Sequence, residues 1–265
     1  MSLIETFAKI EHTLRPIITY LPADVATRLT SYGKREFLKR FVKDVPRERI
    51  QITNEHSVNL WDIKFNTPLF NAAGMFKHGL GYEVVASQGA GAFLAGTTTF
   101  KRRKGNIKHK IRNPFLPFPR SQVAVNWLGL PNLGHESIAN RLSKINKIEG
   151  CPIGASLSYD SEDTKLIALK NMVLGLEIYE KAGVDFIEIN ESCPNVEGKK
   201  VDNNLETELI DRLEFISKNF VAKLERNLPV IVKLSNDTNI NQVNDLIRIL
   251  TDLRFSGVNF GNTST

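Results

Sequence analysis

The chain of 265 residues is 42% hydrophobic and 24% charged, and it carries a formal net charge of +6 at pH 7. This composition is typical of a globular protein that buries a sizeable core, and the length suits one barrel-type domain. No apolar stretch approaches the about 20 residues that span a bilayer, and the first residues lack the basic start and apolar core of a secretory signal. The positive charge suits an anionic partner such as a phosphate, a carboxylate or an acidic membrane surface, whereas nucleic acid is not predicted because the lysines and arginines are spread along the chain.

Residues 1–45 are predicted to form an amphipathic helical extension, followed by a barrel domain over residues 46–265. Apolar residues recur along the extension at three- and four-residue steps. They are Leu3, Phe7, Ile10, Leu14, Ile17 and Leu21, followed by Val25, Leu29, Phe37, Leu38 and Phe41. Basic residues mark the other face of the second half, which leaves two interpretations open, a packed cap and a peripheral contact with the inner face of a membrane.

Beyond the extension, residues 57–65 are predicted to form a short hairpin that closes the bottom of the barrel. Strand-type runs then alternate with helical patterns. The predicted strands are 69–75, 92–99, 153–158, 185–192, 230–235 and 257–263. The predicted helices are 80–87, 135–148, 163–182, 205–226 and 241–253, with Gly183 as the cap that ends the third of them. Residues 101–134, which include several prolines and many basic side chains, are predicted to be a long functional loop.

The alternation of strands and helices implies a parallel sheet with right-handed crossovers. A (β/α)8 barrel, of the TIM-barrel type, and a doubly wound sheet both fit this α/β pattern. No G-x-G-x-x-G motif follows any strand, which argues against a dinucleotide-binding site. No cluster of Cys, His and carboxylate residues has metal-ligand spacing, so no metal is predicted, and His109 and His135 are expected at the surface.

The two cysteines of the chain are Cys151, before one predicted strand, and Cys193, after the next. If these strands are parallel, the thiols lie at opposite ends of the sheet, on the order of 15–20 Å apart at about 3.3 Å per residue. A disulfide needs Cα atoms within about 7 Å, so both are predicted to be free thiols in a reducing, cytoplasmic compartment. Cys151 is expected to be inert packing.

Polar and small residues gather where the predicted strands end, which is where barrels and open α/β sheets place their chemistry. One strand ends in Asn190-Glu191-Ser192-Cys193-Pro194-Asn195, a thiol between carboxamides, although a buried cysteine in an ordinary turn would read the same way. Lys233 lies within an apolar strand, where a lysine needs an anionic partner or a lowered pKa. Further segments of this kind are Ala73-Gly74-Met75-Phe76-Lys77, Gly96-Thr97-Thr98-Thr99, Asn126-Trp127-Leu128-Gly129-Leu130-Pro131-Asn132 and Asn262-Thr263.

Taken together and in this order, the motifs Ala-Ala-Gly-x-x-Lys-x-Gly, Asn-x-x-Gly-Leu-Pro-Asn, Asn-x-Ser-Cys-Pro-Asn, the Val-Lys strand and the terminal Asn-Thr resemble the dihydroorotate dehydrogenase family. The resemblance covers essentially all of residues 57–265. It implies an FMN-containing (β/α)8 barrel, a flavoprotein oxidoreductase of pyrimidine biosynthesis that oxidises dihydroorotate to orotate. It also implies that only about six βα units are present, and that the C-terminal units belong to a longer protein.

The resemblance assigns roles to individual residues. Cys193 falls on the catalytic base that takes the proton from C5 of dihydroorotate, while the C6 hydride passes to N5 of FMN. Substrate-binding positions fall on Lys77, Asn126, Trp127, Leu128, Gly129, Leu130, Asn190, Asn195, Asn262 and Thr263. Flavin-binding positions fall on Ala73, Gly74, Thr97, Ser156, Asn190, Lys233 and Gly261. The chemistry agrees, because carboxamides match the edges of a pyrimidine ring, Lys77 would meet the substrate carboxylate, and Lys233 would stabilise an anionic reduced flavin.

Two classes of this family are mixed in the chain. The extension and the Ala-Ala-Gly segment resemble the membrane-associated, quinone-linked class, whose extension forms a hydrophobic quinone tunnel. The Ser-Cys-Pro-Asn and Gly-Leu-Pro-Asn segments resemble the soluble class, which uses cysteine as the base. Ser156 stands where the quinone-linked class has a flavin-contacting asparagine. The electron acceptor therefore stays open among quinone, fumarate and NAD.

Two other functions stay open as well. One is a flavin-dependent oxidoreductase that acts on another dihydropyrimidine, although the carboxamides at Asn126, Asn190 and Asn195 favour an orotate-type ring. The other is a degenerate, non-catalytic barrel that serves as a scaffold. Fold alone does not separate these options, because barrels support many chemistries.

Overall fold

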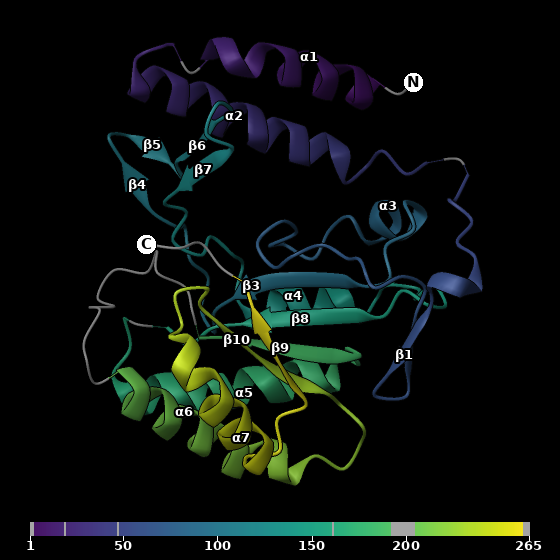
Figure 1. The fold of residues 1–265 in the computed structure, drawn as a ribbon, viewed down its shortest axis with the longest axis vertical. Helices are drawn as coiled ribbons and strands as arrows, with labels where there is room; N and C mark the ends of the chain where they lie inside the picture. The colour runs from purple at the N-terminus through teal and green to yellow at the C-terminus, as the bar shows by residue number, and fades with distance from the viewer. Residues whose placement is uncertain (1–2, 19, 47, 161, 192–204, 262–265) are drawn as a thin grey trace.

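A five-stranded parallel sheet forms the centre of the computed structural model, which describes residues 3–18, 20–46, 48–160, 162–191 and 205–261 (Figure 1). Its strand order is β11-β10-β9-β8-β3. The strands are β3 (Phe93–Thr98), β8 (Ile153–Leu157), β9 (Phe186–Asn190), β10 (Val230–Leu234) and β11 (Gly257–Phe260). Because strands that follow one another in this series also pair in the sheet, with a helix between them, the chain builds successive (β/α) units.

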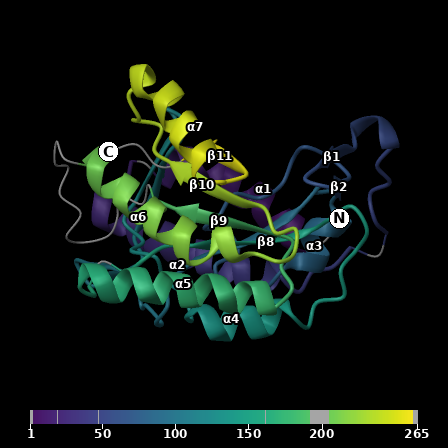
Figure 2. The same ribbon diagram turned by 90° about the horizontal axis from the view of Figure 1, so that it is seen from below.

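Helices cover the outer face of this sheet (Figure 2). The crossover helices are α4 (His135–Leu142), α5 (Lys165–Lys181), α6 (Leu205–Asn219) and α7 (Val243–Asp252), with α3 (Tyr82–Ser87) before the sheet and the short 3-10 turns Asn54–His56, Val221–Lys223 and Ile240–Gln242. Alternate strand residues such as Ile187 and Ile189 join Met172 and Leu176 of α5 in one fully buried cluster. Gly183 ends α5 with a φ of 76°, as the sequence predicts.

A hairpin closes the end of the inner face where the strands begin, as expected for residues 57–65. Its strands are β1 (Val58–Leu60) and β2 (Ile63–Phe65). Phe65 packs at a ring-centroid distance of 6.2 Å from Phe186, and Trp61 lies 6.5 Å from the same ring. Gly154 of the neighbouring strand makes room, since a Cβ there would lie 2.3 Å from the Phe186 ring. This aromatic plug fills the bottom of the inner face, so ligand chemistry is confined to the opposite end.

The strand predicted over residues 69–75 does not form. Asn71 bonds the backbone of Leu94 through both ends of its carboxamide, with Nδ2 donating to the carbonyl at 2.8 Å and Oδ1 accepting from the N–H at 3.2 Å. The segment then meets β3 through a single parallel bridge between Phe76 and Ala95. A side chain thus replaces the backbone ladder, and the positive φ of Gly74, at 102°, turns the chain away from an extended path.

Residues 101–134 are not the open loop that their composition predicts. They contain two small hairpins, formed by β4 (Ile107–Lys108) with β5 (Ile111–Arg112) and by β6 (Phe115–Phe118) with β7 (Val123–Asn126). Residues with positive φ let the chain turn between these short apolar strands. Asn113 lies between the two hairpins, and Gln122 lies in the turn of the second hairpin. In Figure 1 the hairpins extend from the sheet toward the N-terminal helices.

The extension consists of α1 (Leu3–Ile18) and α2 (Ala23–Phe41), which lie side by side (Figure 1). The end of α2 packs onto the barrel, with the Phe41 ring 6.3 Å from that of Phe76. Other members of the apolar stripe are exposed, with exposed fractions of 48% for Phe7, 46% for Leu14 and 52% for Leu29, whereas Phe37 and Leu38 are half-buried. Within the described residues, no helix combines the length and the apolar character needed to cross a membrane.

Candidate functional site

A layer of polar side chains lies on the inner face of the sheet, above the aromatic plug. In a strand alternate residues share a face, so Glu188 and Asn190 share the face of Phe186. Ser156 pairs with Glu188, and Lys233 pairs with Asn190, in the parallel register. Ser156, Glu188, Asn190 and Lys233 are all buried, with at most 6% of each residue exposed. Buried polar groups at the carboxyl end of parallel strands mark a ligand site.

Hydrogen bonds join this layer into one chain across β3, β8, β9 and β11. Asn190 Nδ2 donates to Thr97 Oγ1 at 2.9 Å, and Thr97 Oγ1 lies 3.0 Å from Ser156 Oγ. Ser156 Oγ donates to Glu188 Oε1 at 2.8 Å, while Asn259 Nδ2 donates to Glu188 Oε2 at 2.8 Å. We call these five side chains the inner relay. Three of them, Thr97, Ser156 and Asn190, are predicted flavin contacts that the structure brings together.

Lys233 stands beside the inner relay and is 6% exposed. Its strand neighbours at the same register are Asn190 on β9 and Asn259 on β11. Among the residues that the structure describes, no carboxylate lies within ion-pair distance of its ammonium group, and no hydrogen bond involves that group. A buried ammonium without an anionic partner is costly, so this position suits an anionic ligand.

Gly74 and Lys77 approach the same edge of the sheet from the segment before β3. The Gly74 N–H donates to the Gly96 carbonyl at 2.6 Å, directly before Thr97. A Cβ on Gly74 would lie 3.3 Å from Lys77 Nζ, so the lysine folds back over the glycine. At Gly96, where φ is 111°, a Cβ would lie 2.3 Å from the Ser156 carbonyl oxygen. Glycine at position 96 therefore lets β3 pack closely against the backbone of β8, and the positive φ at both positions favours glycine.

The predicted substrate loop, Asn126 to Leu130, is tied to the end of β3 by Asn132. The fully buried Asn132 carboxamide donates to Thr99 Oγ1 at 2.9 Å and to the Leu130 carbonyl at 2.8 Å, and it accepts from the Gly134 N–H at 2.8 Å. Leu128 is held from the other side, since its carbonyl accepts from the Asn106 N–H at 2.9 Å. The loop is thus fixed at the edge of the sheet where the inner relay ends.

Several predicted site residues lie outside the described part of the chain. They are Cys193, Asn195, Asn262 and Thr263. Their roles stay predictions. Gly261 is described, and its N–H donates to the Leu234 carbonyl at 3.3 Å, which extends β11 beside β10. Ala73 packs against the aromatic plug rather than in the polar layer.

A buried ion pair fixes the last described residue before the predicted base. Arg212 of α6 donates from Nε and Nη2 to Glu191 Oε2 at 3.1 and 2.9 Å, and the two side chains are 9% and 2% exposed. The guanidinium also lies 5.1 Å from the centroid of the Tyr159 ring. Removing one partner of such a pair leaves an uncompensated charge in the interior.

Replacing Arg212 with leucine is therefore expected to lower the free energy of unfolding by about 3–5 kcal/mol. The double variant R212L/E191L should recover most of that loss, because no isolated charge remains buried. Arg248 provides the control, since its contact with Asp245 spans 3.8 Å and both side chains are largely exposed. R248L should change stability by less than about 0.5 kcal/mol in urea titrations. Similar losses in R212L and R248L would contradict this account.

Sequence reasoning missed Glu188 and the environment of His135, and it placed Asn132 in the substrate loop without predicting that Asn132 ties the loop to β3. The first carried a signal, because Glu188 alternates in phase with Phe186 and Asn190 and so must face inward. His135 was expected at the surface and is buried, with Nδ1 2.9 Å from Thr98 Oγ1 and Nε2 without a hydrogen-bond partner. Burial lowers the pKa of His135 to about 3, so the ring is neutral. Only the packing of α4 against α5 places it there, because Gly175 leaves the space that the ring fills.

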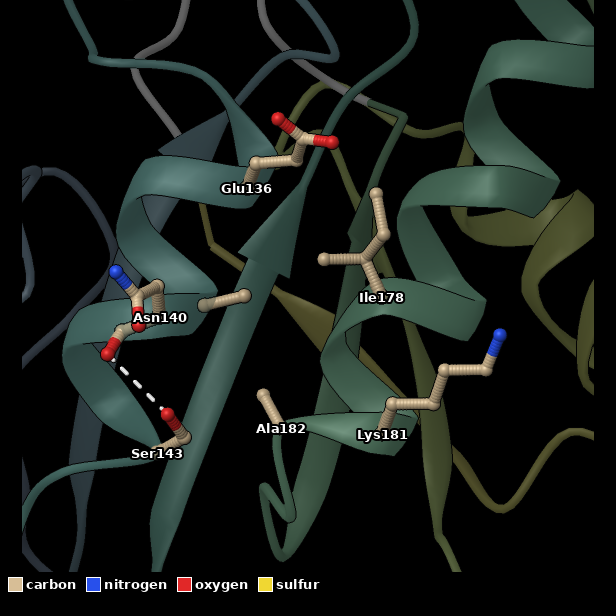
Figure 3. A pocket seen from close by; sticks show the side chains of 7 residues that line it. Glu136, Asn140, Ser143, Ile178, Lys181 and Ala182 are labelled. Atoms are coloured by element: carbon tan, nitrogen blue, oxygen red, sulfur yellow. Dashed lines mark hydrogen bonds between the residues drawn. The ribbon is translucent and has the colours of Figure 1, made fainter.

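The helix layer carries a shallow groove of about 350 Å³ between α4 and α5 (Figure 3). Its lining residues are Glu136, Ala139, Asn140, Ser143, Ile178, Lys181 and Ala182. None of these residues belongs to the inner relay or to the substrate loop. The groove is therefore separate from the candidate site.

Comparison with known proteins identifies a family that this chain matches over most of its length. A family model described as dihydroorotate dehydrogenase matches residues 56–265. The chain is 26% identical over 208 residues to a dihydroorotate dehydrogenase (quinone) of Synechococcus sp. strain JA-2-3B'a(2-13), covering 78% of this chain and 52% of that protein. It is 26% identical over 205 residues to the protein of the same name from Xylella fastidiosa strain M12, covering 76% of this chain and 56% of that one. The chain thus spans about half the length of these relatives.

Two further matches cover larger shares of this chain. A dihydroorotate dehydrogenase (quinone) of Dichelobacter nodosus is 24% identical over 254 residues, which are 95% of this chain and 71% of that protein. A solved structure of DHODH from Eimeria tenella, in complex with ferulenol, aligns with a TM-score of 0.74 at 19% identity, covering 88% of this chain and 66% of that one. These matches confirm the α/β fold class of the TIM-barrel type that the sequence predicts.

Proposed function

Because the chain belongs to the dihydroorotate dehydrogenase family, we propose that it forms part of a flavin-dependent oxidoreductase that oxidises dihydroorotate to orotate in pyrimidine biosynthesis. The proposal rests on the buried polar groups on the inner face of the sheet. There the Lys233 ammonium is buried without an anionic partner among the described residues, beside the hydroxyl groups and carboxamides of the inner relay. Such a set of groups fits a flat, partly anionic heterocycle.

The donor set fits FMN as the cofactor. Lys233 would stand against the part of the ring that becomes negative on reduction, and Thr97, Ser156 and Asn190 would supply hydrogen bonds. Gly74 carries no side chain beside Lys77 Nζ, which would leave space for the ring there. Gly261 completes the proposed flavin contacts, whereas Ala73, which lies against the aromatic plug, stays a prediction of the resemblance. When bound, FMN supplies the hydride acceptor of the reaction.

Substrate binding is assigned to a second set of residues beside the proposed flavin contacts. Lys77 would pair with the substrate carboxylate, and the loop that Asn132 fixes would present Asn126, Trp127, Leu128, Gly129 and Leu130 to the ring. Asn190, Asn195, Asn262 and Thr263 would complete the carboxamide and hydroxyl contacts. Cys193 would hold the proton taken from C5. The strand-end position of these residues supports the assignment.

The direct test is to purify the full-length protein, record its flavin absorbance and add dihydroorotate. Bleaching of the flavin band with formation of orotate is the expected result. If dihydroorotate leaves the flavin oxidised and another dihydropyrimidine reduces it, that dihydropyrimidine is the substrate instead. Protein without flavin would favour the scaffold function.

We infer a quinone as the electron acceptor and a peripheral position on the inner face of a membrane. The names of the relatives from Synechococcus and Xylella support the acceptor. The exposed apolar side chains of α1 and α2 support a lipophilic contact, because such a stripe is costly in water. The soluble-class Ser-Cys-Pro-Asn motif points instead to fumarate or NAD, so the acceptor needs its own test.

Deletion of residues 1–45 is expected to abolish turnover with ubiquinone analogues while flavin reduction by dihydroorotate persists. A second variant, I10S/L14S, keeps α2 in place and changes only exposed apolar side chains, so it should lower quinone turnover without altering substrate affinity. Steady-state assays with ubiquinone, fumarate and NAD provide the measurement. Quinone turnover that survives the deletion, or electron transfer to fumarate or NAD alone, would show that the extension is only a lid.

A further inference from the structure

Glu188 is a buried carboxylate to which neither the family resemblance nor the proposed roles give a task. It is 1% exposed and projects from β9 between Phe186 of the plug and Asn190 of the site. Among the described residues, no lysine or arginine lies within ion-pair distance of it. Two neutral donors, Ser156 Oγ and Asn259 Nδ2, satisfy one carboxylate oxygen each. A charged group held this way at some energetic cost calls for a reason beyond packing.

The carboxylate determines the direction of every hydrogen bond in the inner relay. An ionised carboxylate only accepts, so the single proton of Ser156 Oγ must point to Glu188. Ser156 Oγ can then only accept from Thr97, and the single Thr97 proton points to Ser156. Thr97 Oγ1 in turn accepts from Asn190 Nδ2. The amide nitrogen of Asn190 therefore faces β3, and its amide oxygen faces away from Thr97.

We propose that Glu188 is a positioning residue that sets the donor and acceptor pattern of the flavin site through this one-way relay. The inference rests on the proposed function, and it deepens it by naming what orients Thr97, Ser156 and Asn190. Glu188 lies level with Ser156 in the sheet register and two residues before Asn190 along β9, and it acts through these side chains. Without an acceptor at position 188, both hydroxyl groups can turn, so the relay no longer requires Thr97 Oγ1 to accept from Asn190 Nδ2.

The test compares two substitutions that both remove the charge. Glu188→Met removes the acceptor, so the relay has no fixed direction, and the dissociation constant of FMN should rise about tenfold or more. Glu188→Gln keeps an acceptor, because its amide oxygen can face Ser156 once the Asn259 carboxamide turns over, and its FMN affinity should stay within about threefold of the wild type. Each variant is assayed by FMN fluorescence titration and by the midpoint potential of the bound flavin, which should shift in E188M more than in E188Q.

Thr98→Val provides the matched control. Thr98 neighbours Thr97, but its hydroxyl group lies 2.9 Å from both His135 and Tyr179 and 3.3 Å from the Ser156 backbone carbonyl, so it bonds no side chain of the inner relay. T98V should therefore lower the melting temperature while FMN affinity and flavin potential stay unchanged. If E188M does not fold, Glu188→Ala, a smaller side chain that also lacks an acceptor, decides the matter by the same titration.

Wild-type FMN affinity in E188M, or in E188A where that variant is needed, would overturn the proposal. Equal losses in E188M and E188Q would also overturn it, because charge rather than direction would then matter. These failures differ from a failure of the proposed function, in which the wild-type protein itself binds no FMN or is not reduced by dihydroorotate.

Discussion

Replacing Cys193 with alanine is expected to slow reduction of the bound flavin by dihydroorotate by about 10²–10⁴-fold, the usual contribution of a general base. FMN should stay bound, because the proposed flavin contacts lie on other residues. The Cys193→Ser variant should keep partial activity with its pH optimum moved upward, since a hydroxyl is a weaker acid than a thiol of pKa about 8.5. Stopped-flow reduction under anaerobic conditions measures both effects.

The other cysteine offers the control for this experiment. Cys151 is 1% exposed, and burial raises the pKa of its thiol to about 11, so it is neither accessible nor ionised at neutral pH. Cys151→Ala should cost stability through lost packing and leave the reduction rate unchanged. A near wild-type reduction rate in C193A would remove Cys193 from the role of base.

Substitutions of two lysines are expected to affect different ligands, one the flavin and the other the substrate. Lys233→Met should weaken FMN binding by about 10–100-fold, the effect of losing a hydrogen bond to a charged group, and should change orotate affinity little in the protein that retains flavin. Lys77→Ala should do the reverse, weakening orotate by a similar factor. Flavin fluorescence and orotate titrations measure the two affinities.

Lys147 is a suitable control lysine, because it pairs with Asp185 at 2.6 Å and is 40% exposed, away from the inner face. Lys147→Ala should alter neither affinity. Equal effects of K233M and K77A on orotate would refute the division of labour between the two lysines.

The barrel units could be predicted from the sequence because their signals are local and repeated. Apolar runs such as Val230–Leu234 and the cap at Gly183 determine a strand and a helix end without help from the rest of the chain. Residues 69–75 read as a strand by the same rule, but the Asn71 side chain takes the hydrogen bonds of Leu94 that a strand would need. A tertiary bond of this kind leaves no periodicity in the sequence.

The candidate site divides in the same way. Lys233 and Asn190 could be identified because each stands out against an apolar strand, and the structure pairs them in register. The relay through Thr97, Ser156 and Glu188 could not, since it depends on how three strands align across 91 residues of sequence. Strand alternation alone gives the face of Glu188 but not its partners.

The contact between α2 and the second hairpin links the N-terminal helices to the proposed substrate loop. Ser31 Oγ accepts from the Phe115 N–H at 3.0 Å, and Thr30 Oγ1 donates to the Phe115 carbonyl at 2.5 Å. Both backbone groups of Phe115 in β6 are therefore hydrogen-bonded to α2. The cross-strand neighbour of Phe115 is Asn126, the first residue of the proposed substrate loop. An acceptor or lipid that changes how α2 grips this strand would change substrate affinity, and by thermodynamic reciprocity the substrate would change the affinity for that acceptor or lipid by the same factor.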